Sequence, residues 1–158
     1  MAADQRYQAG RRRHSGAPRG WLTIMTQIDD ERERGELSEL EQGVALRRSM
    51  FGDAAAQATS APGYRQPFED LVTRYCFGNV WQRPGLDHKT RSLLTVGMLA
   101  MLSRPVQLKA HIRGAVANGA TADEIREVLI QVMLYGGLPA AADSFGHATE
   151  VMAELGLA

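Results

Sequence analysis

The sequence predicts an all-α fold, and three observations point to it. Apolar residues recur at spacings of three and four along most of residues 31–158. Helix-capping residues precede these apolar runs, and glycine or proline often follows them. No stretch alternates apolar and polar residues for long enough to be a convincing strand. We therefore expect one helical domain over residues 31–158, which is long enough to bury a single core.

Two helices are expected in the first half of this domain. Residues 31–52 form a polar helix that ends near Gly52 and is followed by a loop to Gly63. Residues 64–79 form a second helix with one apolar stripe, which we expect to be buried. The stripe consists of Phe68, Leu71, Val72, Tyr75 and Cys76. The sequence WQRPGLD then forms a turn, and Asp87 at its end is a good N-cap for the next helix.

The most apolar helix is expected directly after this turn. Its sequence, KTRSLLTVGMLAMLS, covers residues 89–103 and is apolar nearly all round, so we expect it to be the central buried element. Pro105 suits the first turn of another helix, which ends at a Gly119 C-cap.

Local signals define two more helices at the C-terminal end. Thr121 and Glu124 form a capping box that begins the first of them. The glycine pair at 136–137 ends this helix. Pro139 then begins a last helix, which runs to about Glu154.

The N-terminal residues 1–30 show no sustained period, and we expect them to form a mobile basic arm. Residues 1–24 contain five arginines and one acidic residue, Asp4. The arm is either a solvated tail or a contact for an acidic partner. Met25 is a possible natural start, in which case the preceding residues are not native.

Composition excludes several classes of protein. The chain has 18 basic and 18 acidic residues, so its net charge does not suggest a nucleic-acid partner. No apolar run approaches the ~18 residues that span a bilayer, and no signal-peptide segment follows the arginines. The single cysteine, Cys76, excludes an internal disulfide framework. We expect a cytoplasmic protein that binds neither nucleic acid nor membrane.

Two polar residues are predicted to share apolar helix faces. His111 lies at helical spacing with Leu108 and Ile112, where a histidine is either a satisfied core residue or a catalyst. Arg91 lies on the most apolar helix, where an unpaired buried guanidinium is too costly, so we expect a carboxylate partner. That partner is either a protein acid such as Glu127 or an anionic substrate, whose carboxylate fits the guanidinium fork.

Other kinds of site receive little support. The histidines have no metal-ligand spacing, so no metal site is expected. No GxSxG motif is present and Cys76 has no nearby basic motif, so nucleophilic catalysis is not indicated. Glu127, in line with Gln131 and Tyr135, is either a solvated or interface acid or part of a site. Seven methionines and the broad apolar helix suggest a hydrophobic surface that another subunit completes.

Two segments resemble the carboxymuconolactone decarboxylase family, most specifically over residues 77–142. They read FGNVWQRPGLDHKTRSLLTVGMLA and LKAHIRGAVANGATADEIREVLIQVMLYGGLPAA, and WxRPGL and TRSL are particular to the 4-carboxymuconolactone decarboxylase branch. The resemblance implies an alkyl hydroperoxidase D-like helical bundle that is an obligate homo-oligomer, a trimer or hexamer with sites between subunits. Hydroperoxidase D relatives carry CxxC shortly before the histidine that His111 resembles. Here the segment is SRPVQLKAH, so disulfide-based peroxide reduction has no mechanism.

The implied activity is decarboxylation of 4-carboxymuconolactone to β-ketoadipate enol-lactone and CO2, in protocatechuate breakdown by the β-ketoadipate pathway. No cofactor is implied, because the conjugated lactone carbonyl of the substrate accepts the electrons that CO2 leaves behind. The alternative is a non-catalytic or differently specific helical oligomer of the same family.

The resemblance also suggests roles for particular residues. Arg91 would hold a carboxylate or the developing oxyanion. His111 would donate the proton or hydrogen-bond the lactone oxygen, and Glu127 would orient His111 or shuttle the proton. The expected substrate-binding residues are Trp81 and Tyr135 as pocket walls and, as a weaker candidate for the second carboxylate, Arg113.

Overall fold

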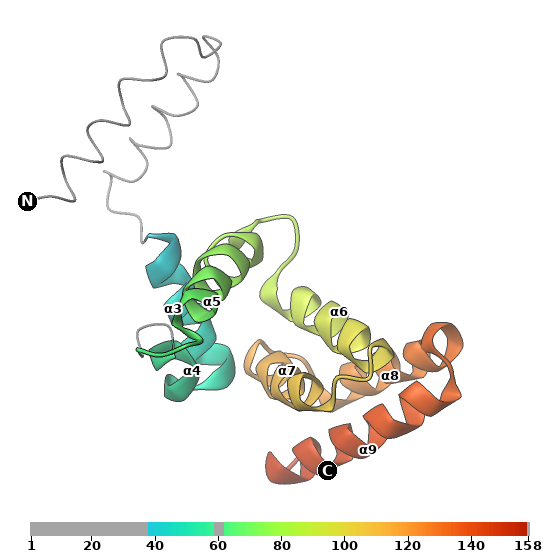
Figure 1. Cartoon of the computed structure of the whole chain (residues 1–158). Coiled ribbons are helices and arrows are strands. Elements are labelled where there is room, and N and C mark those ends of the chain that lie inside the picture. Colours follow the sequence, from blue (N-terminus) through green and yellow to red (C-terminus); the bar gives the residue numbers. More distant parts are fainter. Residues whose placement is uncertain (1–37, 59–61, 158) are drawn as a thin grey trace, which may run out of the picture. The chain divides into compact units, whose positions relative to one another are not determined.

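The computed structural model describes residues 38–58 and 62–157. All regular structure in these two ranges is helical, which confirms the all-α prediction (Figure 1). Residues 38–158 form one compact unit. The expected basic arm over 1–30 and the first residues of the expected helix 31–52 lie outside the described residues.

The N-terminal layer of this unit is built on helix α3. Its elements are α3 (Glu39–Phe51), α4 (Asp53–Gln57), α5 (Gln66–Leu71), the π-helix η2 (Val72–Phe77) and the 3-10 turn η3 (Val80–Gln82). Ser38 begins α3 with a capping box, in which its backbone N–H donates to a Glu41 carboxylate oxygen at 2.8 Å. Gly52 ends α3 as predicted and adopts a φ of 83°.

The expectation of a buried apolar stripe over 64–79 is wrong for most of the stripe in the single chain, although Val72 and Cys76 are partly buried against Phe77 and its neighbours. Three of its members, Phe68, Leu71 and Tyr75, are 57%, 63% and 62% exposed. The residues that face inward are instead Glu69, Thr73 and Phe77. The buried Arg47 of α3 provides hydrogen-bond and ionic partners for Glu69 and Thr73, so a polar face is the one that packs.

Four long helices form the C-terminal layer. They are α6 (His88–Met101), α7 (Pro105–Ala117), α8 (Ala122–Gly136) and α9 (Leu138–Glu154). The predicted caps are confirmed: Asp87 accepts from the Thr90 N–H at 2.7 Å, and Thr121 and Glu124 form a capping box. Every helix within the described ranges is too short or too polar to be a membrane-spanning segment.

Helix α6 packs against α7, α8 and α9, but only one of its faces is buried. Ser92, Val96 and Ala100 are inaccessible, whereas Leu94 and Met98 on another face are about half exposed. The helix α6 is thus the central element of the α6–α9 core, as expected, but within one chain it is buried on one face only. The three partner helices cover one side of α6 and leave an apolar side uncovered.

The two layers have separate hydrophobic cores. The larger core joins α6 to α9 and includes Val96, Leu108, Ile112, Ile125, Leu129 and Val151. The smaller core lies under α3 and consists of Leu46, Met50 and Phe77, with Phe51 and Trp81 packed against it. The layers meet where α3 packs against α7, and the candidate site lies at this junction (Figure 1).

Candidate active site

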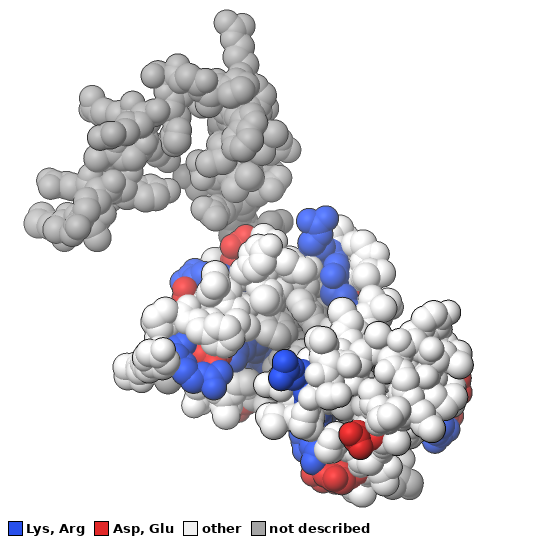
Figure 2. Space-filling view, turned by 45° about the vertical axis from the view of Figure 1, so that its right-hand side comes forward, with Lys and Arg blue, Asp and Glu red and all other residues white. Residues whose placement is uncertain are grey.

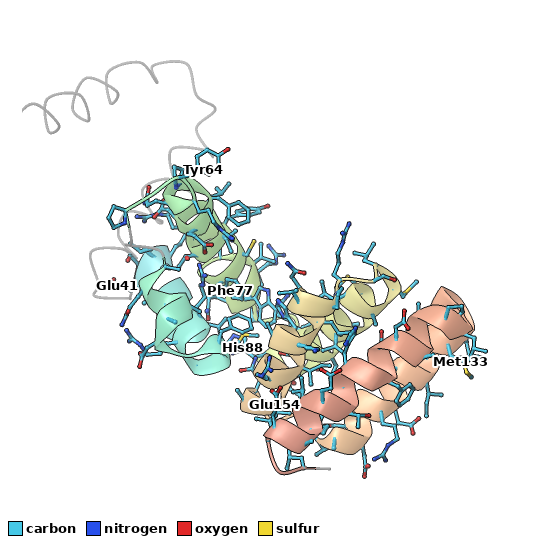
Figure 3. The ribbon with its side chains drawn as sticks, turned by 60° about the horizontal axis from the view of Figure 1, so that its bottom comes forward. Glu41, Tyr64, Phe77, His88, Met133 and Glu154 are labelled. Carbon is cyan, nitrogen blue, oxygen red and sulfur yellow. The ribbon has the colours of Figure 1, made fainter. Side chains whose placement is uncertain are left out.

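His111 lies on α7 beneath a group of aromatic side chains from the N-terminal layer. Its ring contacts Phe51 edge-on, with centroids 5.1 Å apart, and the Trp81 ring lies 6.4 Å away. Phe77 joins these two residues, at 5.7 Å from Phe51 and 5.6 Å from Trp81. We call Phe51, Phe77 and Trp81 the aromatic shell. Figure 3 shows Phe77 and His88 at the junction between the two layers.

The environment of His111 favours its neutral form. Burial lowers the pKa of His111 below its ordinary value, because the charged imidazolium is poorly solvated there. Its Nδ1 atom is buried and has no hydrogen-bond partner among the described residues. Buried polar atoms are almost always hydrogen-bonded in native proteins, so an orphaned nitrogen on a titratable ring is a candidate ligand-binding atom.

A glycine allows Phe51 to reach His111. Gly114 lies one turn after His111 and is buried against α3. A Cβ atom at this position would lie 3.0 Å from both the Phe51 Cε1 and the Met50 Cε atoms. The missing side chain thus permits the close approach of α3 and α7 that closes the shell over the imidazole.

Arg91 has different hydrogen-bond partners from the ones expected. Its Nε donates to the Leu86 carbonyl at 3.1 Å and its Nη2 to the Arg83 carbonyl at 2.9 Å. Among residues 38–58 and 62–157, no carboxylate pairs with Arg91, so the expected pairing with a protein acid such as Glu127 is wrong for this part of the chain. Carbonyl oxygens of the turn satisfy the guanidinium, which fastens the turn after Trp81 to the first turns of α6.

The other predicted site residues do not meet His111 within one chain. Glu127 and Tyr135 are both exposed on α8, and Tyr135 is 74% exposed. Arg113 is partly exposed on α7 and pairs with Glu154 of α9. Across the described parts of the chain, no ion pair or hydrogen bond joins Glu127 to His111. Of the predicted site residues, the single chain brings together only His111 and Trp81. Arg91 binds the turn that follows Trp81.

Sequence reasoning missed three residues near the imidazole. Phe51 contacts it directly, Phe77 packs against Phe51 and Trp81, and the ring of His88 lies 6.3 Å from the Trp81 ring. Phe77 stands at the start of the FGNVWQRPGL segment, which was a usable signal. Phe51 had none, because its role depends on the packing of α3 against α7.

The chemistry available here is that of a partly buried imidazole beside an aromatic shell. Such a ring can accept a hydrogen bond at Nδ1, and it can take up a proton when an anion binds beside it. Aromatic walls exclude water, which strengthens electrostatic contacts to a bound ligand. Within residues 38–58 and 62–157, no group of three or more His, Cys, Asp or Glu side chains is placed to hold a metal ion.

Comparison with known proteins assigns the chain to a family. A sequence model described as the carboxymuconolactone decarboxylase family matches residues 66–150. The chain is 36% identical to the 4-carboxymuconolactone decarboxylase of Acinetobacter baylyi over 119 residues, which are 74% of this chain and 89% of that protein. It is also 36% identical to the nitrosuccinic acid decarboxylase npaB of Metarhizium robertsii over 106 residues, 66% of this chain and 74% of that protein. This chain belongs to the carboxymuconolactone decarboxylase family.

Proposed function

We propose that this protein is a cytoplasmic decarboxylase that converts 4-carboxymuconolactone to β-ketoadipate enol-lactone and CO2 in protocatechuate breakdown, without a cofactor. The observation that carries the proposal is the partly buried His111, whose Nδ1 atom is buried and unpartnered among the described residues beside the aromatic shell. It occurs in a chain that aligns with 89% of the length of a 4-carboxymuconolactone decarboxylase.

The proposed reaction needs little from the protein besides binding and a proton. The bond from the ring carbon to its carboxylate breaks, CO2 leaves, and the electron pair moves through the ring double bond into the lactone carbonyl. The product of this step is a dienolate. One proton added to the carbon next to the carbonyl then gives the enol-lactone. Desolvation of the carboxylate and stabilisation of the enolate oxygen are the contributions expected of the site.

His111 is the proposed proton donor. It is neutral in the free protein because burial lowers its pKa, so it is a poor acid before substrate binds. The substrate brings two carboxylates, and a nearby negative charge raises the pKa of an imidazole. We therefore expect His111 to take up a proton as the substrate binds and to release it to the dienolate carbon.

An apolar groove on the outside of α6 and α8 supports a homo-oligomer. The groove holds approximately 420 Å³ and is lined by residues that include Leu94, Met98, Val128 and Tyr135. In Figure 2 a broad area over the half of the molecule built from α6 to α9 carries no charged side chains. An exposed apolar surface of this kind is typical of a subunit interface. We propose that a second copy covers it in a homotrimer or homohexamer.

This assembly would also give Glu127 and Tyr135 a place in the site. Gln131 and Tyr135 line the groove, and Glu127 lies one turn before Gln131 on the same side of α8. A carboxylate and a phenol at the edge of an interface are positioned to reach a neighbouring subunit. We propose that they approach His111 of that subunit and complete the site.

The direct test is an ultraviolet assay of the purified full-length chain with freshly generated 4-carboxymuconolactone, in the presence of a chelator and with no cofactor added. We expect enol-lactone and CO2 to form at enzyme-like rates. A folded, oligomeric sample that leaves the lactone unchanged would contradict the proposal.

Nitrosuccinic acid belongs in the same assay as a second candidate substrate, because the chain is 36% identical to a nitrosuccinic acid decarboxylase. A nitro group, like a conjugated lactone carbonyl, can accept the electron pair that CO2 leaves. Turnover of nitrosuccinate alone would keep the reaction class and change the substrate. Turnover of neither acid would favour a non-catalytic oligomer of the same family.

A further inference from the structure

A buried ion pair lies next to Phe77 of the aromatic shell. Arg47 of α3 is only 8% exposed, and its Nη2 atom lies 2.8 Å from Oε2 of Glu69. Its Nη1 donates to the Thr73 hydroxyl at 2.6 Å, and that hydroxyl donates to the Glu69 carbonyl at 2.7 Å. The hydrogen bond from Arg47 lowers the pKa of the Glu69 carboxyl, so the pair is charged at neutral pH.

This pair contacts the shell directly. The guanidinium carbon of Arg47 lies 5.8 Å from the centre of the Phe77 ring, within the range of a cation–π contact. Phe77 in turn packs against Phe51 and Trp81, the two rings that contact His111. A continuous series of contacts therefore runs from Glu69 through Arg47 and Phe77 to the imidazole.

The backbone around the pair leaves little room for adjustment. A Cβ atom at Gly43, one turn before Arg47 on α3, would lie 2.1 Å from the Thr73 carbonyl oxygen. Thr73 belongs to the π-helix η2, a rare type of helix that is often found at functional sites. The close contact between α3 and η2 keeps Arg47 next to the Phe77 ring.

We propose that Arg47 and Glu69 are positioning residues for His111, which hold Phe77 so that the aromatic shell stays closed over the imidazole. This inference builds on the role of His111 in the proposed function. A buried pair of this kind contributes little to stability compared with a well-packed apolar pair, and orientation of a neighbouring group is a reason for its presence. The guanidinium fork also fixes direction more strictly than an ammonium group would.

The test compares three variants of the full-length chain. Arg47→Met and Glu69→Gln each break the buried pair. Arg65→Met is the matched control, because the Arg65 Nη2 atom also lies 3.0 Å from Glu69 but its side chain is 74% exposed. The readouts are the pKa of His111 by NMR, with His111→Gln to assign its resonance, and kcat and KM for the lactone.

We expect both pair-breaking variants to loosen the shell and admit water to the imidazole. The pKa of His111 should then rise toward its unperturbed value of about 6.5. The kcat should fall by about 10- to 100-fold with a smaller change in KM, since misplacement of a catalytic group affects the chemical step. Arg65→Met should change neither the pKa of His111 nor kcat. Arg47→Lys should keep both closer to their wild-type values than Arg47→Met does.

Unchanged His111 pKa and kcat in folded Glu69→Gln would overturn the inference, even if its melting temperature falls. This milder variant keeps the test decisive if Arg47→Met does not fold. The NMR titration does not depend on turnover. If the protein does not decarboxylate the lactone, the proposed function fails, while the pKa comparison still decides whether the pair positions His111.

Discussion

The imidazole of His111 is held by ring contacts from Phe51 and Trp81, with its Nδ1 atom buried and unpartnered among the described residues. A core histidine that serves only packing normally satisfies both ring nitrogens, because an unpaired buried polar atom is costly. His147 also has a buried Nδ1 atom without a partner among the described residues, so the catalytic interpretation of His111 rests on this nitrogen together with the ring contacts of the aromatic shell.

Replacement of this side chain gives the first prediction. His111→Gln keeps a polar group of similar length but cannot exchange a proton near neutral pH. We expect kcat for the lactone to fall by ~10²–10⁴-fold, the usual contribution of a general acid. Steady-state kinetics on the folded variant measure the change. Gln107→Ala, an exposed change one turn earlier on the same helix, is the control and should keep wild-type kcat.

The lowered pKa of His111 also predicts how stability depends on pH. Between the unfolded value of about 6.5 and the lower folded pKa, the unfolded chain binds more protons than the folded one. The His111 contribution to stability is thus present above about pH 6.5 and is lost as the pH falls toward the folded pKa. Urea unfolding at several pH values should show this slope in the wild type, and His111→Gln should reduce it. An identical slope in both proteins would argue against a lowered pKa.

At the scale of elements, two glycines inside α-helices differ in the space available for a side chain. A Cβ atom at Gly43 would lie 2.1 Å from a carbonyl oxygen of η2, whereas one at Gly146 in α9 meets no atom within 4 Å. We expect Gly43→Ala to destabilise the protein by about 1–3 kcal/mol or more, since backbone must move. Gly146→Ala should be neutral or stabilising by up to about 1 kcal/mol because alanine favours helix. Thermal unfolding of the two variants provides the comparison.

The elements also show which features local sequence can predict. Caps and terminators such as Thr121, Pro105 and Gly52 act within one turn of the chain, and they stand at helix ends as predicted. The helix expected over residues 31–52 nevertheless begins only at Glu39, after the Ser38 capping box. The inward face of residues 64–79 was predicted wrongly because Arg47, far away in sequence, makes Glu69 and Thr73 the buried side. Apolar spacing contains no information about such a partner.

In the candidate site, too, residues with a local sequence signal were predicted and residues that depend on long-range packing were not. His111 and Trp81 were recognised because they stand in recognisable segments, and the structure brings them together. Phe51 and Arg47 were missed, since their importance arises only when α3 packs on α7 and η2. The predicted partner of Arg91 was wrong because the guanidinium donates to backbone carbonyl oxygens of the preceding turn. Residue spacing does not reveal such backbone contacts.

At the scale of the whole molecule, the separation of Glu127 from His111 predicts complementation between subunits. His111→Gln and Glu127→Gln homo-oligomers should each be strongly impaired. After mixing, unfolding and refolding together, some sites would combine an intact His111 from one subunit with an intact Glu127 from another. We expect partial recovery of activity, measured with the lactone assay on the mixed sample.

Refolding each variant alone is the control for this experiment and should recover nothing. A mixture that stays as inactive as its components would show that one chain provides both residues or that Glu127 has no role. Size-exclusion chromatography with light scattering on the same samples reports whether an oligomer has formed.

The division of the molecule into a large and a small core has a consequence for its motions. The core under α3 has three buried members, Leu46, Met50 and Phe77, whereas the α6–α9 core is several times larger. Regions with little buried apolar surface open at lower free energy than the rest of a protein. Amide hydrogens of α3 should therefore exchange with deuterium before those of α8. Because the imidazole lies between the two layers, the opening that exposes these amides would also admit a ligand, and a bound lactone analogue should slow their exchange.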